Sequence, residues 1–296
     1  MNDLINSFLM APPKSSIVPP AVSQRAEMVL DRKCVFVTML TTDSFSPGCS
    51  VLCRSLRKHN ANHAIYVMLT ADVSKIIVKQ LGKLCDGIIL VDKIESPFKE
   101  TDLAGDAAVA VSKAAGGGSE GKVGGVDAVK PSWLASDMTK LRLWGLTQFD
   151  SIVYIDADCL VMRNVEELFG RDTAFAAAPD VFPPDKFNAG VLLLRPNQDV
   201  FQSMVEALAK LPSYDGGDTG FLNAFYPDWY TESAVSRLPF GFNAQRTLYW
   251  FTKDRPGYWQ SIQPLSIIHY SSSPKPWQQT DKKGELEMLW WVQSFP

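Results

Sequence analysis

Short apolar runs alternate with longer segments of helical spacing from Cys34 onward, and this alternation limits the fold more than any other feature of the sequence. The expected strands lie at 34–39, 64–69, 87–91, 152–155, 175–178, 191–194 and 266–270. The expected helices follow Pro47 and lie at 73–84, 133–148, 200–210 and from about Thr219. Strands that alternate with helices are typical of a parallel sheet covered by helices and joined by right-handed crossovers. The sequence therefore predicts an α/β fold with a mostly parallel central sheet.

The length of 296 residues suits one large α/β domain. We expect this domain at 31–296, after an N-terminal extension at 1–30. Within it, residues 102–130 are rich in Gly, Ala and Ser and include three consecutive glycines. Because such a segment has little apolar area to offset its ordering entropy, we predict a flexible insertion there.

Composition and charge exclude several classes of partner. Hydrophobic residues make up 46% of the chain and the formal net charge is -3, which gives nucleic acid no polycation to bind. No run approaches the ~20 apolar residues that a membrane-spanning helix needs. The five cysteines lack paired spacing, so we expect reduced thiols packed in a core. With no basic leader at the amino terminus, we expect a cytoplasmic location.

The run Ile152 to Ile155 ends in two carboxylates, Asp156 and Asp158. In an extended chain, side chains two residues apart leave the same face, so both carboxylates can turn toward one point past the end of the strand. Ligands of open α/β sheets bind at this edge, and Mg²⁺ is typically held by one or two carboxylates plus substrate phosphates. The pair therefore predicts a metal bridge to a diphosphate. A solvated Asp-x-Asp turn is the alternative.

Two later segments offer further groups for the same site. His269 ends an apolar run and is the candidate third ligand, because imidazole combined with carboxylates suits Mn²⁺ as well as other first-row ions. Lys275, six residues later, can stabilise departing negative charge on phosphates. Asp215 and Asp218 lie among glycines directly before a predicted helix, where a sugar could approach, although Asp218 could simply cap that helix.

The order of the motifs resembles that of the glycogenin-like glycosyltransferases, the retaining GT-A enzymes of glycosyltransferase family eight. The motifs are Phe36-Val37-Thr38, Thr41-Thr42-Asp43, Thr139-Lys140-Leu141, Asp156-Ala157-Asp158, Phe187-Asn188-Ala189-Gly190-Val191, Gly217-Asp218-Thr219-Gly220-Phe221-Leu222-Asn223, and His269 with Lys275-Pro276-Trp277. The resemblance implies a single GT-A, Rossmann-like domain with a mixed, mostly parallel sheet.

The resemblance also implies a role for each matching residue. Asp156, Asp158 and His269 match the positions that hold Mn²⁺, with Mg²⁺ as the alternative, and Lys275 matches the lysine on the donor diphosphate. Thr41, Thr42 and Phe45 match positions around the uridine. The positions matched around the rest of the donor are Lys140, Ala157, Asp180, Asn188, Ala189, Asp215, Asp218 and Thr219. Of these, Lys140, Asp215 and Asp218 are the candidate catalytic residues.

The implied reaction moves a hexose from a UDP-sugar, with retention at the anomeric carbon, to an unknown sugar, lipid or protein acceptor. A covalent intermediate on Asp218 or Asp215 and attack from the face that the diphosphate leaves are both open. Thr219 stands where such enzymes often carry glutamine. Trp250 aligns with glycogenin's acceptor tyrosine, with Tyr249 one residue earlier, which argues against self-glycosylation.

Two other functions remain as alternatives, and a homodimer is compatible with each. The first is a non-catalytic protein that binds nucleotide sugars through the same fold. The second is a nucleotidyltransferase, but the loop after the first strand, Leu40 to Ser44, has neither the glycine nor the basic residue that this activity needs.

Overall fold

The computed structural model describes residues 33–98, 137–254, 257–278 and 284–294. The predicted extension at 1–30 and the predicted insertion at 102–130 lie outside these ranges. Within them, no helix is long and apolar enough to cross a membrane.

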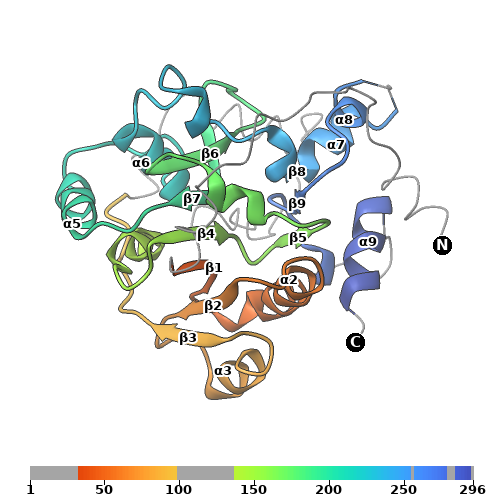
Figure 1. Cartoon of the computed structure of the whole chain (residues 1–296), viewed down its shortest axis with the longest axis horizontal. Helices are drawn as coiled ribbons and strands as arrows, with labels where there is room; N and C mark the ends of the chain where they lie inside the picture. The colour runs from red at the N-terminus through yellow and green to blue at the C-terminus, as the bar shows by residue number, and fades with distance from the viewer. Residues whose placement is uncertain (1–32, 99–136, 255–256, 279–283, 295–296) are drawn as a thin grey trace, which may run out of the picture.

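A six-stranded sheet forms the centre of the molecule, in the order β3-β2-β1-β4-β7-β6 (Figure 1). Its strands are β1 (Cys34–Leu40), β2 (Ala64–Leu69), β3 (Gly87–Leu90), β4 (Ser151–Ile155), β6 (Phe175–Pro179) and β7 (Phe187–Leu194). The first four are parallel, whereas β7 runs antiparallel to both β4 and β6. This confirms the predicted α/β fold with a mixed, mostly parallel sheet.

The continuous apolar runs follow from burial of the sheet on both faces. In β4, Val153 and Ile155 pack into one core cluster, and Ile152 and Tyr154 pack into another. Successive side chains of a strand point to opposite faces, so one run of apolar residues serves both layers. All five residues of β4 are buried as a result.

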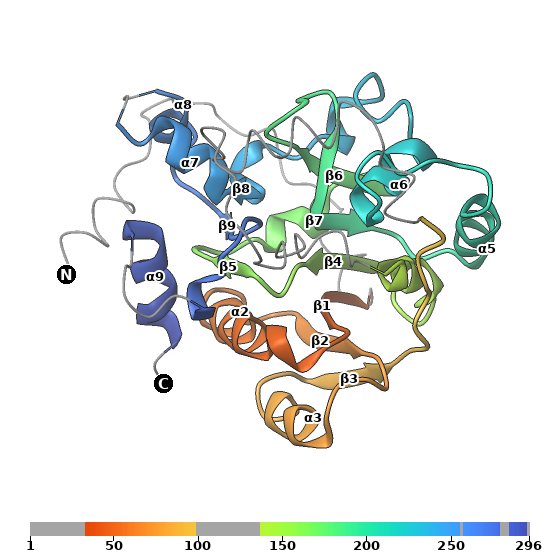
Figure 2. The same ribbon diagram turned by 180° about the vertical axis from the view of Figure 1, so that it is seen from behind.

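Helices cover both faces of this sheet (Figures 1 and 2). The helices α2 (Ser46–His59) and α3 (Lys75–Leu81) contribute to the first cluster, and α5 (Gln198–Ala207) and α6 (Asp218–Phe225) to the second. All five cysteines are reduced thiols, as predicted, but only Cys49, Cys53 and Cys159 are buried in the first cluster, whereas Cys34 and Cys85 are partly exposed.

One helical prediction was wrong in detail, and one alternative is excluded. Where a helix was expected at 133–148, the described part forms the 3-10 helix η4 (Thr139–Gly145), and residues 133–136 lie outside the described ranges. The N-cap of α6 is Gly217, so Asp218 is the first residue of the helix and not its cap.

A second sheet of three strands joins the first at the carboxyl end of β4. It contains β5 (Cys159–Val161), β9 (Ile267–His269) and β8 (Ala244–Gln245), in the order β5-β9-β8. The helices α7 (Arg246–Thr252), α8 (Tyr258–Ser261) and α9 (Glu285–Ser294) lie near it, and their buried residues share a third core cluster with Ile268. Leu286 and Trp290 of α9 are buried, so this helix covers the core.

The remaining turns of 3-10 helix are η1 (Asp43–Phe45), η5 (Glu166–Gly170), η6 (Ala234–Ser236), η7 (Phe240–Phe242) and η8 (Pro276–Gln278). The turn 156–158 connects β4 of the large sheet to β5 of the small one. Both predicted metal-binding aspartates therefore lie where the two sheets meet.

Candidate functional site

Backbone hydrogen bonds fix the turn between β4 and β5 to both sheets. The Asp156 N–H donates to Gly190 O of β7 (2.8 Å), and the Tyr270 N–H, just after β9, donates to Asp158 O (3.0 Å). The two carboxylates therefore lie at the carboxyl end of β4, in the position expected for ligand binding in an open α/β sheet.

The imidazole of His269 lies beside both carboxylates. The small sheet pairs His269 with Cys159, the residue that follows Asp158. As a result, His269 Nε2 lies 3.3 Å from Asp158 Oδ1 and 3.9 Å from Asp156 Oδ2. The structure thus brings together the three side chains predicted to hold a metal.

Asn243, which the sequence reasoning missed, orients this imidazole. The Gly190 N–H and Asn243 Nδ2 both donate to Asn188 Oδ1 (each 2.9 Å), which leaves Asn243 Oδ1 as an acceptor. This oxygen lies 2.8 Å from His269 Nδ1. The network therefore places a proton on Nδ1, which donates to Asn243 Oδ1, and leaves Nε2 as the ring nitrogen that faces the carboxylates. An imidazole nitrogen beside two carboxylates is a set of ligand types that fits a divalent metal ion.

A second grouping of potential ligands differs by one residue. Ligand atoms of Asp158, Cys159 and His269 all lie within 4.8 Å of one another. Burial, together with the nearby carboxylates Asp158 and Asp156, raises the pKa of the Cys159 thiol well above its usual value. The thiolate is the form that binds metals. The chemistry therefore favours the carboxylate of Asp156 over the thiol as the third donor.

Lys140 in η4 holds two carboxylates together. Its ammonium lies 3.2 Å from Asp156 Oδ1 and 2.7 Å from Asp218 Oδ2, and it donates to Ala189 O (3.1 Å). Burial alone would lower the pKa of Lys140, but the two carboxylates outweigh it and raise the pKa above its usual value. Burial raises the pKa of Asp156 despite the neighbouring lysine. Tyr154 donates its hydroxyl proton to the same Asp156 oxygen.

Lys275 binds Oδ2 of Asp158, the oxygen other than the one nearest His269. Its ammonium donates to Asp158 Oδ2 (2.6 Å) and to Tyr270 O (2.8 Å), and the residue is only 4% exposed. Burial opposes ionisation of Asp158, but Lys275 and His269 outweigh it and hold the pKa of Asp158 far below its usual value. Asp158, a predicted metal ligand, and Lys275, the predicted phosphate-binding lysine, therefore form one charged unit.

The loop after β1 lies against this unit. The Lys275 ammonium lies 5.7 Å from the centre of the Phe45 ring, which packs edge-to-face against Trp277 at 5.6 Å. Trp277 Nε1 donates to Ser44 O (3.0 Å). Thr42 is exposed and Thr41 is partly exposed at the start of the same loop. The three residues predicted to bind uridine therefore lie on one loop beside Lys275.

A local shift in strand pairing frees the backbone of β7 for the site. The partners of Ala177 and Ala178 in β6 are Leu192 and Asn188, so residues 189–191 have no partner in β6. Ala189 O accepts from Lys140, and the Ala189 N–H donates to Thr219 Oγ1 (3.2 Å). Bulges of this kind often lie next to functional sites.

The other predicted sugar-binding carboxylates line loops beside β6 and α6. Asp215 Oδ1 accepts from Ser213 Oγ (2.8 Å) and from the N–H groups of Gly217 and Gly220 (each 2.9 Å). Asp180 Oδ1 accepts from Gln245 Nε2 (2.8 Å). Burial raises the pKa of both carboxyl groups.

Trp250, which aligns with the acceptor tyrosine of glycogenin, and its neighbour Tyr249 differ in exposure and in contacts. Tyr249 is buried, and its hydroxyl donates to the carboxylate of Glu285. Trp250 is 42% exposed, and its ring lies 4.4 Å from the guanidinium of Arg246.

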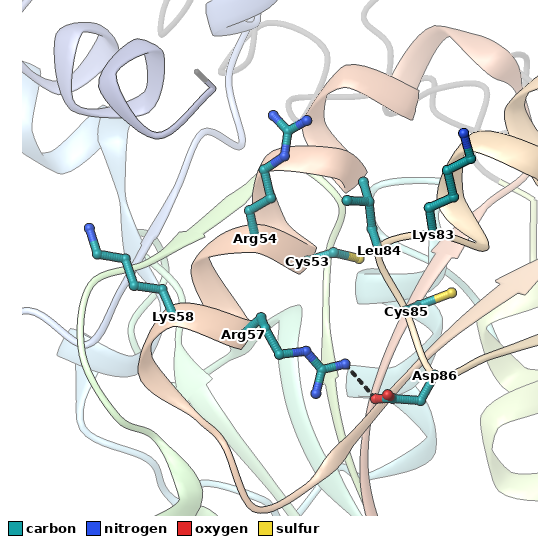
Figure 3. A pocket seen from close by; sticks show the side chains of 8 residues that line it. All are labelled: Cys53, Arg54, Arg57, Lys58, Lys83, Leu84, Cys85 and Asp86. Atoms are coloured by element: carbon teal, nitrogen blue, oxygen red, sulfur yellow. Dashed lines mark hydrogen bonds and ion pairs between the residues drawn. The ribbon is translucent and has the colours of Figure 1, made fainter. Parts of the chain in front are cut away.

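A cavity of about 540 Å³ lies apart from this site, beside the last turn of α2 (Figure 3). Asp86, in its wall, accepts from the Ile65 N–H (2.7 Å), which places the cavity at the amino end of the parallel strands. Arg57 pairs with Asp86 (2.6 Å), Arg54 donates to Ser294 O (2.6 Å), and Lys58 donates to Gln293 Oε1 (3.3 Å). Cations are also favoured at a helix C-terminus. These positive groups are therefore explained by contacts within the protein.

The protein has an α/β fold, and its carboxylate–imidazole–lysine cluster lies at the carboxyl end of the parallel strands, where ligands of such sheets bind. The chain belongs to glycosyltransferase family 8, because the model described as "Glycosyl transferase family 8" matches residues 36–281. This confirms the family resemblance inferred from the sequence motifs.

Individual relatives agree with this assignment. Human Glycogenin-2 is 33% identical over 89% of this chain and 47% of its own length, and human Glycogenin-1 is 31% identical over 83% and 62%. The chain thus spans about half to three-fifths of the length of these relatives. Among solved structures, apo glycosyltransferase GlyE from Streptococcus pneumoniae TIGR4 has a TM-score of 0.59 at 22% identity, covering 88% of this chain and 60% of that one. That likeness concerns the fold.

Proposed function

We propose that this protein transfers a hexose from a UDP-sugar to an acceptor, with retention at the anomeric carbon. Asp156, Asp158 and His269 would hold Mn²⁺, or Mg²⁺ in its place. The observation that carries the proposal is the convergence of His269 Nε2 on the two carboxylates, at 3.3 and 3.9 Å. Membership of glycosyltransferase family 8 supports sugar transfer in general.

Lys275 is the group that would receive the departing diphosphate. It is buried and bound to Asp158, so its ammonium is already desolvated and positioned before a donor arrives. A fixed positive group stabilises negative charge that develops on a leaving phosphate more effectively than water does. The bound metal supplies Lewis-acid stabilisation of the same charge.

The neighbouring loops would bind the rest of the donor. Thr41, Thr42 and Phe45 face the uridine in this proposal. The group assigned to the diphosphate and sugar comprises Lys140, Ala157, Asp180, Asn188, Ala189, Asp215, Asp218 and Thr219. Thr219 already accepts from the Ala189 N–H, so it fixes α6 against β7 as well as facing the donor.

The two candidate catalytic carboxylates differ in their surroundings. One oxygen of Asp215 accepts hydrogen bonds from Ser213 and Gly217 of its own loop and from Gly220 in the first turn of α6, which suits a residue that fixes this loop to the helix. Asp218 instead meets the Lys140 ammonium at the carboxylate cluster. We therefore assign Asp218 to stabilising, or bonding to, the anomeric carbon, and Lys140 to holding Asp218 and Asp156 in place.

The test combines turnover with binding. Purified protein and Mn²⁺ are incubated with UDP-glucose, UDP-galactose, UDP-glucuronate or UDP-N-acetylglucosamine, and UDP release is measured beside UDP affinity by calorimetry. We expect UDP release from at least one donor, lost when a chelator removes the metal. UDP binding without release from any donor would support a non-catalytic binding protein of the same fold. Failure to bind UDP at all would contradict both functions.

A further inference from the structure

The segment between β9 and η8 carries Lys275 and is held from behind by one arginine. Arg246, the first residue of α7, donates through Nη2 to Ser272 O (2.7 Å) and Pro274 O (2.9 Å). Its Nη2 and Nε also reach Ser272 Oγ, at 2.9 and 3.2 Å. Two backbone carbonyls within three residues of Lys275 are thus fixed by a single guanidinium.

Arg246 is itself fully enclosed. Its relative exposure is 0%, and its guanidinium lies 4.4 Å from the ring centre of Trp250 and 5.5 Å from that of Tyr270. A planar guanidinium between aromatic rings, with its donors in a fixed fork, has little freedom to move. The backbone carbonyls of Ser272 and Pro274 that Arg246 binds are therefore also restrained.

The counter-charge comes from the last described helix. Glu287 of α9, 4% exposed, accepts from Arg246 Nη1 (2.8 Å). Removing water from both ions is costly, and in some proteins a buried pair of this kind specifies one arrangement of the chain. Here the arrangement joins α7, α9 and the Lys275 segment.

Aromatic contacts attach α9 to the other side of the same segment. Trp291 Nε1 donates to Pro276 O (3.1 Å), and the Trp290 ring lies 5.6 Å from the ring of Trp277. Trp277 in turn binds Ser44 O next to Phe45. The Tyr270 hydroxyl also donates to Leu286 O of α9 (2.6 Å), so helix α9 contacts residues on both sides of Lys275.

We propose that Arg246 and Glu287 are positioning residues for donor binding: by fixing the carbonyls of Ser272 and Pro274, they hold the Lys275 ammonium where the diphosphate of the donor binds. This inference rests on the proposed function, which assigns the diphosphate to Lys275. Neither residue touches the donor. Both act through the backbone that ends at Lys275.

A double-mutant cycle on UDP affinity tests this inference. UDP binding is measured by calorimetry with Mn²⁺ for the wild type, Glu287→Gln, Lys275→Met and the double variant. We expect Glu287→Gln to weaken UDP binding about tenfold, and to add less than about twofold once Lys275 is already replaced. The reason is that a positioning residue has no effect when the group it positions is gone.

Matched variants separate positioning from general loss of stability. Tyr249→Phe removes another contact between α7 and α9, the hydrogen bond to Glu285, and should lower the melting temperature without changing UDP affinity. Ser272→Ala removes the hydroxyl contacts of Arg246 at a partly exposed position and should weaken UDP binding two- to threefold. It serves as the folded probe if Glu287→Gln does not fold.

Different results would contradict the assignment of the diphosphate to Lys275 and the positioning role of Arg246 and Glu287. If Lys275→Met left UDP affinity unchanged, the assignment of the diphosphate to Lys275 would be wrong, and this inference would fall with it. Lys275→Met could instead weaken UDP binding while the double variant loses affinity by the product of the two single-variant losses, with Glu287→Gln or with Ser272→Ala. That result would overturn only the positioning role. An equal loss of UDP affinity in Tyr249→Phe would also overturn it.

Discussion

Asn243 shows how one uncharged side chain sets the chemistry of a charged site. It accepts from His269 Nδ1 because its own amide nitrogen is committed to Asn188 Oδ1. This contact fixes the ring so that Nε2 faces Asp156 and Asp158. Removing a group that orients a metal-binding histidine in this way typically weakens metal binding about 10- to 100-fold.

We therefore expect Asn243→Ala to raise the Mn²⁺ concentration needed for UDP binding by about 10- to 100-fold. Asn243→Asp keeps an oxygen for the His269 Nδ1–H and should recover part of the loss. Titration of Mn²⁺ against UDP binding measures both effects. The same Mn²⁺ requirement in Asn243→Ala and wild type would show that this amide does not orient the ligand.

Gly190 leaves room for the same imidazole. A Cβ at this position would overlap the Cε1 and Nδ1 atoms of His269 and lie 2.9 Å from Asn188 Oδ1. The imidazole cannot move away without losing its place beside the two aspartates.

We expect Gly190→Ala to cost about 1–3 kcal/mol of stability, as overpacking of a close-packed site usually does, and to weaken Mn²⁺-dependent UDP binding. Gly170→Ala is the matched control, because a Cβ there meets nothing within 4 Å. Urea unfolding and Mn²⁺ titration of both variants give the comparison. Equal stability and equal Mn²⁺ dependence in the two variants would contradict the steric account.

At the scale of elements, Glu166 ties the turn between α2 and β2 to η5. Its carboxylate accepts from the Asn62 N–H and Asn62 Nδ2 (each 2.9 Å) and from Asn164 Nδ2 (3.1 Å). Burial opposes ionisation, but these hydrogen bonds outweigh it and lower the pKa of Glu166 to about 2 from its usual 4.5. A lowered pKa in the folded state means that the ionised carboxylate stabilises the fold.

This contribution is fully present above about pH 4.5 and is lost as the pH falls through about 2. We expect Glu166→Gln to be about 1–2 kcal/mol less stable than the wild type near pH 7, with a smaller difference at about pH 3. Glu167→Gln is the control, since that side chain is 60% exposed. Urea unfolding at both pH values measures the difference, and a constant gap across this range would rule out ionisation as the cause.

The order of strands along the chain could be predicted because most strands of the large sheet are apolar runs buried on both faces, although β3 at its edge is only partly buried. The predicted strand at 152–155 and β4 (Ser151–Ile155) differ by one residue. The strands β5 and β8 were missed because they have only three and two residues, too few for a periodicity to show. Their pairing depends on contacts between distant segments, such as Ala244 with Ile268.

The charged residues of the site could be selected from their motifs, but two neutral residues that orient them, Asn243 and Gln245, could not. Asn243 and Gln245 stand in no motif, and only the folded chain places Asn243 beside His269 and Gln245 beside Asp180. Arg246 and Glu287 are likewise 41 residues apart in sequence. Their burial as an ion pair has no signal in the sequence alone.

At the scale of the whole molecule, the site lies at the junction of two sheets. Asp156 follows β4 of the large sheet, whereas His269 ends β9 of the small one. Their convergence therefore depends on the contact between the sheets, which the turn 156–158 and the hydrogen bond from Tyr270 N–H to Asp158 O maintain. The metal that fits this donor set would join the two sheets and would stabilise the folded protein on binding.

The central claim is that Asp156, Asp158 and His269 bind a divalent cation that the donor diphosphate shares. Calorimetric titration of Mn²⁺ in the presence of UDP tests it most directly, with wild type, Asp156→Ala and, as a control, Asp172→Ala, whose carboxylate is 85% exposed and pairs with Arg195. We predict UDP-linked Mn²⁺ binding in the wild type and in Asp172→Ala, and a loss of at least about tenfold in affinity in Asp156→Ala. Mn²⁺ binding of equal strength in Asp156→Ala would contradict the claim.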